Sequence, residues 1–151
     1  MAKLLKLRSA QTVLAAVFPF TAADTMVNTA GSEVAFGASG TNKFDVITMP
    51  PASVVVGGRV IVKTAASGST STLDIGDSDD EDRYTETAPI DLADPDAPAS
   101  GFEMLGDGKQ YSGSQALRLT VVNGGAVTAT DAVVVVNYIV VGRASENVKT
   151  T

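Results

Sequence analysis

The alternation of hydrophobic and polar positions is clearest near the end of the chain, where residues 131–143 read Asp-Ala-Val-Val-Val-Val-Asn-Tyr-Ile-Val-Val-Gly-Arg. β-Branched and aromatic side chains dominate this stretch, and they suit the packed, pleated surface of a sheet. Side chains alternate between the two sides of a strand, which places Val135 on one side and Val134 and Val136 on the other. Because both sides are apolar, the pattern predicts a central strand that is covered on each face.

Shorter stretches of the same kind recur along the chain, separated by glycine, proline and asparagine. They are residues 13–20, 32–36, 44–49, 54–64, 73–76 and 117–122, with one short strand expected at 90–92 or 102–105 within the irregular segment 85–113. Gly57-Gly58 interrupts one of these stretches and predicts either a hairpin turn or a bulge; the short first arm favours the bulge. Asn123-Gly124-Gly125 predicts a turn, and Asn-Gly is a strong hairpin signal. Strands spaced about 8–12 residues apart predict an all-β sandwich.

The two ends of the chain differ from its body. At 151 residues, the chain is expected to form one domain with a core of its own. Residues 1–20 are predicted to be an N-terminal arm or a first strand, residues 21–143 a single β-sandwich, and residues 144–151 a polar tail. The arm is basic, whereas the body is acidic. Its apolar run is short and interrupted, which argues against a secretory signal, and no stretch reaches the roughly 18 apolar residues of a membrane span.

Composition argues against several classes of function. The chain has neither His nor Cys, so it lacks the commonest general base and the commonest soft metal ligands. It has no Gly-x-Ser-x-Gly elbow, no phosphate-binding loop and no dinucleotide fingerprint. A net charge of −6 disfavours binding to nucleic-acid phosphates. The sequence therefore predicts a non-catalytic binding or structural protein without a cofactor. The enzymatic alternative is a hydrolase with an unrecognised carboxylate or Ser–Lys site.

One run of carboxylates is unusually dense. It comprises Asp74, Asp77, Asp79, Asp80, Glu81 and Asp82. Hard oxygen ligands at this density suit Ca²⁺, although their spacing does not match an EF-hand loop. The candidate ligands are Asp74, Asp77, Asp79 and Asp82. The preferred interpretation is a solvated loop partly neutralised by Arg83, without a metal. The alternatives are a patch that meets a basic partner, and a Ca²⁺-dependent adhesion or fibre module that uses the acidic loop 74–82.

Several segments, taken in order, carry a family resemblance. They are residues 44–50 (FDVITMP), 54–64 (VVVGGRVIVKT), 73–77 (LDIGD), 82–84 (DRY) and the valine-rich segment 133–143. Together, over roughly residues 30–143, they resemble the small capsid decoration (cement) or head-fibre proteins of tailed bacteriophages. Related modules also occur in other phage structural proteins, so the resemblance leaves open which part of the virion this chain belongs to.

The resemblance implies a jelly-roll-like antiparallel β-sandwich with an extended N-terminal arm. It implies a virion protein on the outer capsid surface that binds the lattice of the major capsid protein, forms a homodimer or homotrimer, and stabilises the shell without catalysis. No nucleic-acid or membrane partner is expected. The arm would then contact the shell or a neighbouring subunit. The interface candidates are Lys3, Leu4, Leu5, Lys6, Leu7, Arg8, Pro50, Pro51 and Arg83.

Overall fold

The computed structural model describes residues 12–85, 88–94, 102–103 and 108–141, which form strands joined by turns. The strands are β1 (Leu14–Thr21), β2 (Thr25–Val27), β3 (Glu33–Ala35), β4 (Gly40–Thr48), β5 (Ser53–Thr64), β6 (Ser71–Gly76), β7 (Ile90–Asp91), β8 (Phe102–Glu103), β9 (Ala116–Asn123) and β10 (Asp131–Val140). None of these residues belongs to a helix that could span a membrane.

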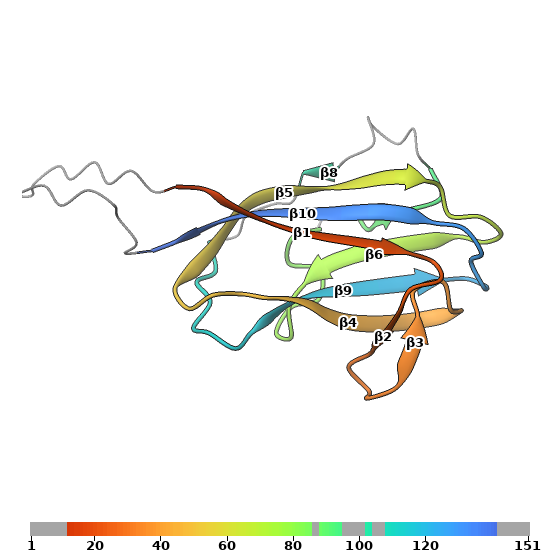
Figure 1. The fold of residues 1–151 in the computed structure, drawn as a ribbon, viewed down its shortest axis with the longest axis horizontal. Coiled ribbons are helices and arrows are strands. Elements are labelled where there is room, and N and C mark those ends of the chain that lie inside the picture. The colour runs from red at the N-terminus through yellow and green to blue at the C-terminus, as the bar shows by residue number, and fades with distance from the viewer. Residues whose placement is uncertain (1–11, 86–87, 95–101, 104–107, 142–151) are drawn as a thin grey trace, which may run out of the picture.

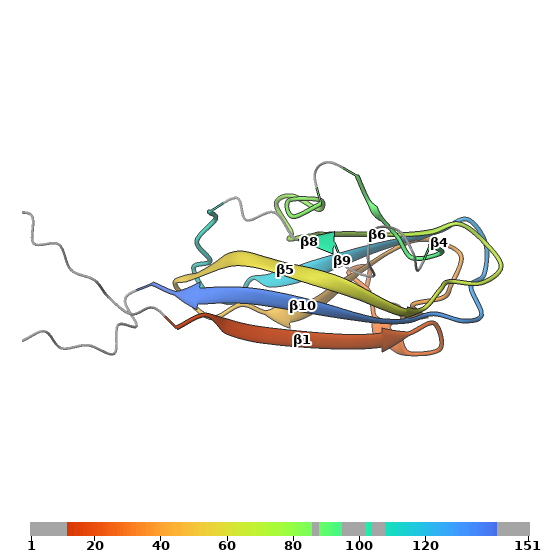
Figure 2. The ribbon, with the colours of Figure 1, turned by 90° about the horizontal axis from the view of Figure 1, so that it is seen from above.

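Eight of the strands form two sheets that pack face to face (Figures 1 and 2). The strand orders are β1-β10-β5-β8 and β4-β9-β6-β7, while β2 and β3 form a separate hairpin beside one edge. The pairing is nested and antiparallel, β1 with β10, β4 with β9, β5 with β8, and β6 with β7. One long antiparallel ribbon folded over into two sheets has this pairing. The all-β antiparallel sandwich is therefore confirmed, and the strand order agrees with the jelly-roll-like expectation.

The core lies between the two sheets and consists of alternate side chains from facing strands. Fully buried members include Phe44, Leu73, Ile75 and Leu119 from one sheet and Val55, Val60, Val134 and Val136 from the other. Four phenylalanines extend this core along one edge. The ring centroids of Phe20 and Phe36 lie 4.9 Å apart and those of Phe36 and Phe44 4.3 Å apart. Aromatic contacts of this kind join β1 to β4 through the segment after β3.

β10 is a central strand, as predicted, with β1 on one side and β5 on the other. Its inward side chains, such as Val134 and Val136, are buried against the second sheet. Its outward side chains, such as Val133 and Val135, are only half-buried. Among the described residues, the second sheet covers only the inner face of β10, so the prediction that both faces are covered is wrong for this part of the chain.

Two other strand predictions have clear outcomes. β5 is one continuous strand whose register shifts opposite Asn137 and Tyr138, leaving Val56 as the additional residue beside Gly57, so the bulge is confirmed. The irregular segment 85–113 contributes two short strands, β7 and β8, where one was expected. Each lies at the edge of a sheet and pairs with a longer strand.

The Asn-Gly sequence after β9 does not form the hairpin that it suggests, because β9 and β10 belong to different sheets. Asn123 is buried and makes tertiary contacts instead. Its side-chain amide donates to the carbonyl oxygens of Phe36 and Ala38, both at 2.9 Å, and its oxygen accepts from Ser71 Oγ at 2.6 Å. Gly124 is needed for close approach, since a Cβ there would lie 2.6 Å from Thr70 Oγ1. The segment after it crosses between the sheets.

The N-terminal region joins the sandwich earlier than residue 21. β1 pairs with β10 along its whole length, from Leu14 opposite Tyr138 to Thr21 opposite Asp131. Of the two alternatives for residues 1–20, the structure therefore supports a first strand from Leu14 onward. The rest of the predicted arm, residues 1–11, and the predicted tail lie outside the described residues. The chain enters β1 and leaves β10 at the same end of the sandwich (Figure 1).

Candidate functional site

The acidic run forms a tight loop, residues 77–85, that folds back on the end of β6. Gly76 makes this possible, because a Cβ at that position would lie 2.1 Å from the carbonyl oxygen of Asp80. The amide of Asp77 donates to that same oxygen at 2.8 Å, and the amide of Tyr84 donates to the Ile75 carbonyl at 2.9 Å. The loop is thus held by its own backbone and by the strand that precedes it.

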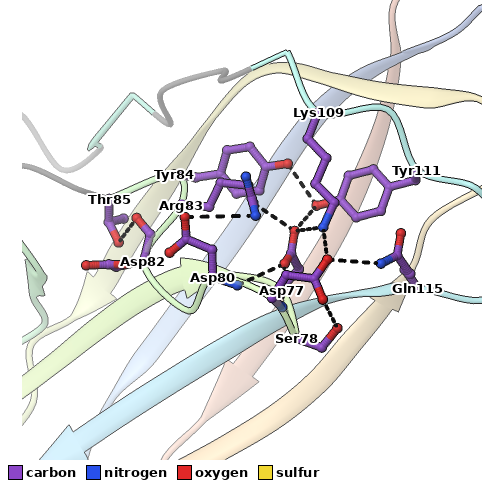
Figure 3. Close-up of polar contacts among 11 residues, drawn as sticks. Asp77, Ser78, Asp80, Asp82, Arg83, Tyr84, Thr85, Lys109, Tyr111 and Gln115 are labelled. Carbon is purple, nitrogen blue, oxygen red and sulfur yellow. Dashed lines mark hydrogen bonds and ion pairs between the residues drawn. The ribbon is translucent and has the colours of Figure 1, made fainter.

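Asp77 is the buried centre of a polar cluster, with its side chain fully inaccessible to solvent (Figure 3). Its Oδ1 accepts from the amides of Asp79 at 2.9 Å and Asp80 at 3.2 Å. Its Oδ2 accepts from Arg83 Nε at 2.9 Å, Lys109 Nζ at 2.8 Å and Tyr111 OH at 3.2 Å. A buried carboxylate remains ionised where it is paired and hydrogen-bonded, and Asp77 has two cationic partners among its donors. The Asp77 cluster is defined as Asp77, Asp79, Arg83, Lys109 and Tyr111.

Two tyrosines connect the cluster to both sheets. The hydroxyls of Tyr84 and Tyr111 lie 2.8 Å apart, and both side chains are fully buried. Because the single proton of Tyr111 is donated to Asp77, Tyr84 donates to Tyr111. The backbone of Tyr111 bonds to the start of β5, its amide donating to the Ser53 carbonyl at 2.8 Å. The cluster therefore joins the end of β6 in one sheet to the start of β5 in the other.

The pKa values of the cluster follow from this geometry. Burial raises the pKa of Asp77, but the hydrogen bonds from Lys109 and the Asp79 amide, with the charges of Lys109 and Arg83, outweigh burial and lower it. Burial lowers the pKa of Lys109, but its bonds to the two carboxylates raise it overall. Burial, and next the hydrogen bond with Tyr84, raise the pKa of Tyr111. At neutral pH Asp77 and Lys109 are therefore ionised and Tyr111 is neutral.

The carboxylates of three candidate Ca²⁺ ligands, Asp74, Asp77 and Asp79, already accept hydrogen bonds from other side chains, whereas the contact described for Asp82 is to its backbone. Asp79 accepts from Lys109 Nζ at 2.8 Å, Asp74 accepts from Thr85 Oγ1 at 3.2 Å, and the carbonyl oxygen of Asp82 accepts from the Thr85 amide at 2.7 Å. Within the described ranges, no three acidic side chains are grouped so as to hold a metal ion. The side chain of Arg83 is only 17% exposed and pairs with Asp77. The Ca²⁺-dependent module stays a prediction, and no described contact favours it.

The outward side of β4, β9 and β6 is charged, and we call it the polar face. Arg118 forms a two-pronged pair with Asp45 on the neighbouring strand, at 2.8 and 3.2 Å, and this pair raises the pKa of Arg118. Lys43 pairs with Glu81 from the acidic loop. Between these contacts, Thr120 points outward yet is buried, because its register partners Lys43 and Asp74 both reach residues of the loop. The loop therefore covers part of this face.

The outward side of β1, β10 and β5 has the opposite character, and we call it the apolar face. Its members are Ala15, Val17, Pro19, Ile61, Val133 and Val135. Val17 lies opposite Val135, and Val133 lies between Pro19 and Ile61 in the register. Val17 is 59% exposed, and no described element packs over it. This face is therefore mainly apolar and open to solvent, and the exposed Arg59 on β5, which lies opposite Val135, is a charged member of it.

The remaining interface candidates fall in two places. Pro50 and Pro51 form the turn in which the chain passes from β4 in one sheet to β5 in the other, with Pro51 exposed and the Pro50 carbonyl accepting from Ser53 Oγ at 2.6 Å. The arm residues Lys3 to Arg8 lie outside the described residues. Sequence reasoning missed Lys109 and Tyr111, which come from the irregular segment with no local pattern to connect them to Asp77.

Comparison with known proteins gives a structural likeness only. No family model matches the chain, and no curated protein matches it. A chain of the capsid asymmetric unit of cyanophage Pam1 is similar, with a TM-score of 0.56 and 18% identity, over 93% of this chain and 92% of that one. A chain of the acid-stable capsid structure of Helicobacter pylori bacteriophage KHP30 has a TM-score of 0.47 and 16% identity, over 85% and 92%. At this level of identity, the likeness to the Pam1 chain establishes a shared fold.

Proposed function

We propose that this chain is a structural protein of a bacteriophage virion that binds the outside of the assembled capsid and stabilises it, without catalysis. The observation that supports this proposal is the likeness to the Pam1 capsid chain, which spans almost the whole of both chains. The order of segments that resembles decoration proteins points to the same role. The absence of His and Cys from the chain agrees with a role in binding rather than in chemistry.

Binding to the assembled shell supplies the stabilisation by mass action. A protein that binds the closed lattice and not its separated subunits shifts the equilibrium towards the closed form. Many copies on one shell act together, because each bound copy holds neighbouring subunits at a high effective concentration. Modest affinity per copy is therefore sufficient, and a rigid sandwich with a basic arm needs no deep pocket for this role.

The direct test compares capsids that contain this chain with capsids that lack it. Capsids without the chain should lose their contents at a lower temperature and at low ionic strength, and purified protein added back should restore resistance. Co-sedimentation should show binding to assembled capsids and not to free capsid protein. Equal resistance of both kinds of capsid, with no binding, would overturn the proposal.

A truncation tests the arm separately. Removal of residues 1–11 leaves β1 intact, since that strand begins at Leu14. If the arm contacts the shell, the truncated protein should keep its thermal transition but bind capsids more weakly than the full chain. Replacing only the charges, with Lys3→Ala, Lys6→Ala and Arg8→Ala together, separates electrostatic attraction from the packing of the leucines. Unchanged capsid binding by the truncated protein would exclude the arm as a contact.

A further inference from the structure

We infer that the apolar face is the contact surface between two copies of this chain, sheet against sheet. The face consists mainly of short apolar side chains without a bulky aromatic anchor. One row crosses three strands in register through Pro19, Val133 and Ile61, and the next runs from Val17 through Val135 to Arg59 at the margin of the face. Flat faces of this kind pack against other sheets, whose side chains interdigitate at a separation of about 10 Å. A second copy offers such a sheet with the same composition. This inference does not depend on the capsid proposal.

The distribution of charge favours a second copy as the occupant. The chain carries a net charge of −6, so two copies repel each other over most of their surfaces. On the strands β1, β10 and β5, the single carboxylate is Asp131, which lies 3.5 Å from Lys63, and the exposed Arg59 adds a further positive charge. A face-to-face pair would keep the two polar faces at least about 20 Å apart, beyond the screening length of about 8 Å in physiological salt. Two copies therefore meet through their least acidic sides.

The size of the face sets the expected strength. At about 3.3 Å per residue and 4.8 Å between strands, a ten-residue strand within a three-stranded face spans roughly 33 by 14 Å, or about 450 Å² before side-chain relief is counted. A pair would bury about 1,000 Å² in total, near the lower limit for specific interfaces. The dimer should therefore be reversible and dependent on protein concentration rather than permanent.

The experiment measures the mass of the full chain by light scattering and sedimentation, from micromolar to near-millimolar concentration. Wild-type protein should pass from monomer to dimer over this range. Val17→Lys should remain monomeric, because two lysines would be buried in an apolar contact. Val122→Lys is the matched control, since Val122 is an exposed strand valine on the polar face, and this variant should dimerise like wild type. Thermal unfolding checks that each variant is folded, and Ala15→Lys replaces Val17→Lys if that variant does not fold.

Single cysteines give an independent readout, because the chain contains none of its own. The rate at which a thiol reagent labels Val17→Cys should fall as protein concentration rises, whereas the rate for Val122→Cys should stay constant. A wild-type chain that is monomeric at every concentration overturns the inference, as does a dimer that survives Val17→Lys. Loss of the dimer on removal of residues 1–11 would assign the contact to the arm instead. If the wild-type chain is monomeric and Val17→Lys no longer binds capsids, the apolar face contacts the shell and not a second copy.

Discussion

The two outer faces of this sandwich are built in opposite ways. On the polar face, strand side chains pair with each other and with the acidic loop, and even Thr120 is buried beneath these contacts. On the apolar face, Val17 and its neighbours are exposed, and no described element covers them. An apolar strand pattern therefore predicts that side chains are buried, but it does not identify whether the same chain or another molecule covers them. One face is covered by residues of the same chain, whereas no described residue covers the other.

The largest expected effect is the loss of the charge at the centre of the Asp77 cluster. Asp77→Asn leaves Lys109 and Arg83 beside a neutral group in a buried site, and we expect the free energy of unfolding to fall by about 3 kcal/mol. Chemical denaturation at neutral pH measures this change. Asp79→Asn is the matched control in the same loop, and it should cost much less because that carboxylate is exposed to water. Equal losses for the two variants would show that burial of Asp77 does not determine its contribution.

Adjacent valines on β10 compare the inner and outer faces directly. Val134→Ala opens a cavity in the core and should lower the free energy of unfolding by about 2 kcal/mol. Val135→Ala removes the same atoms from the apolar face and should cost less than about 1 kcal/mol in the dilute monomer. Denaturation of both variants at low protein concentration tests the difference. Similar costs would mean that the outward face is already covered in the single chain.

Acid should lower the free energy of unfolding, because protonation removes the charge of Asp77. Its pKa in the folded chain is lowered from the ordinary value of 3.8, so its contribution is complete above that value and is lost as the pH falls through the lower folded-state pKa. Wild-type stability should therefore decline below about pH 4 more steeply than that of Asp77→Asn. Comparing the two pH profiles by denaturation isolates this carboxylate from the others. Parallel profiles would contradict the lowered pKa.

The smallest expected effect is that of Ca²⁺. Both oxygens of Asp77 already accept hydrogen bonds, and Asp79 is paired with Lys109, so a cation would have to displace existing partners. We expect millimolar Ca²⁺ to leave the thermal transition of the wild-type protein unchanged, and titration calorimetry to show no heat of binding. A saturable rise in the transition temperature would restore the Ca²⁺-dependent module as the better hypothesis.

Much of the fold follows from local patterns in the sequence. The central position of β10, the bulge at Gly57 and the sandwich class all follow from alternation and from glycine placement. Asn123 shows where local reasoning fails, since its side chain bonds to residues far along the chain instead of shaping a hairpin. Local patterns fail to predict the Asp77 cluster for the same reason. Its Lys109 donor lies 32 positions away in an irregular segment, and no local pattern encodes that contact.

The nesting of β1 with β10 also constrains how the chain folds. The first strand of the sandwich pairs with the last, so the sheet β1-β10-β5-β8 is incomplete until residue 140 has been synthesised, although the strands of the other sheet end at Asn123. Contacts between such distant residues require costly loop closure, which places sandwiches among the slowly folding small proteins. During synthesis, the apolar strand β1 has no partner until β10 has been made, so it can contact other chains. We therefore expect folding to be slow and to occur after synthesis, with the unpaired β1 as the point where aggregation begins.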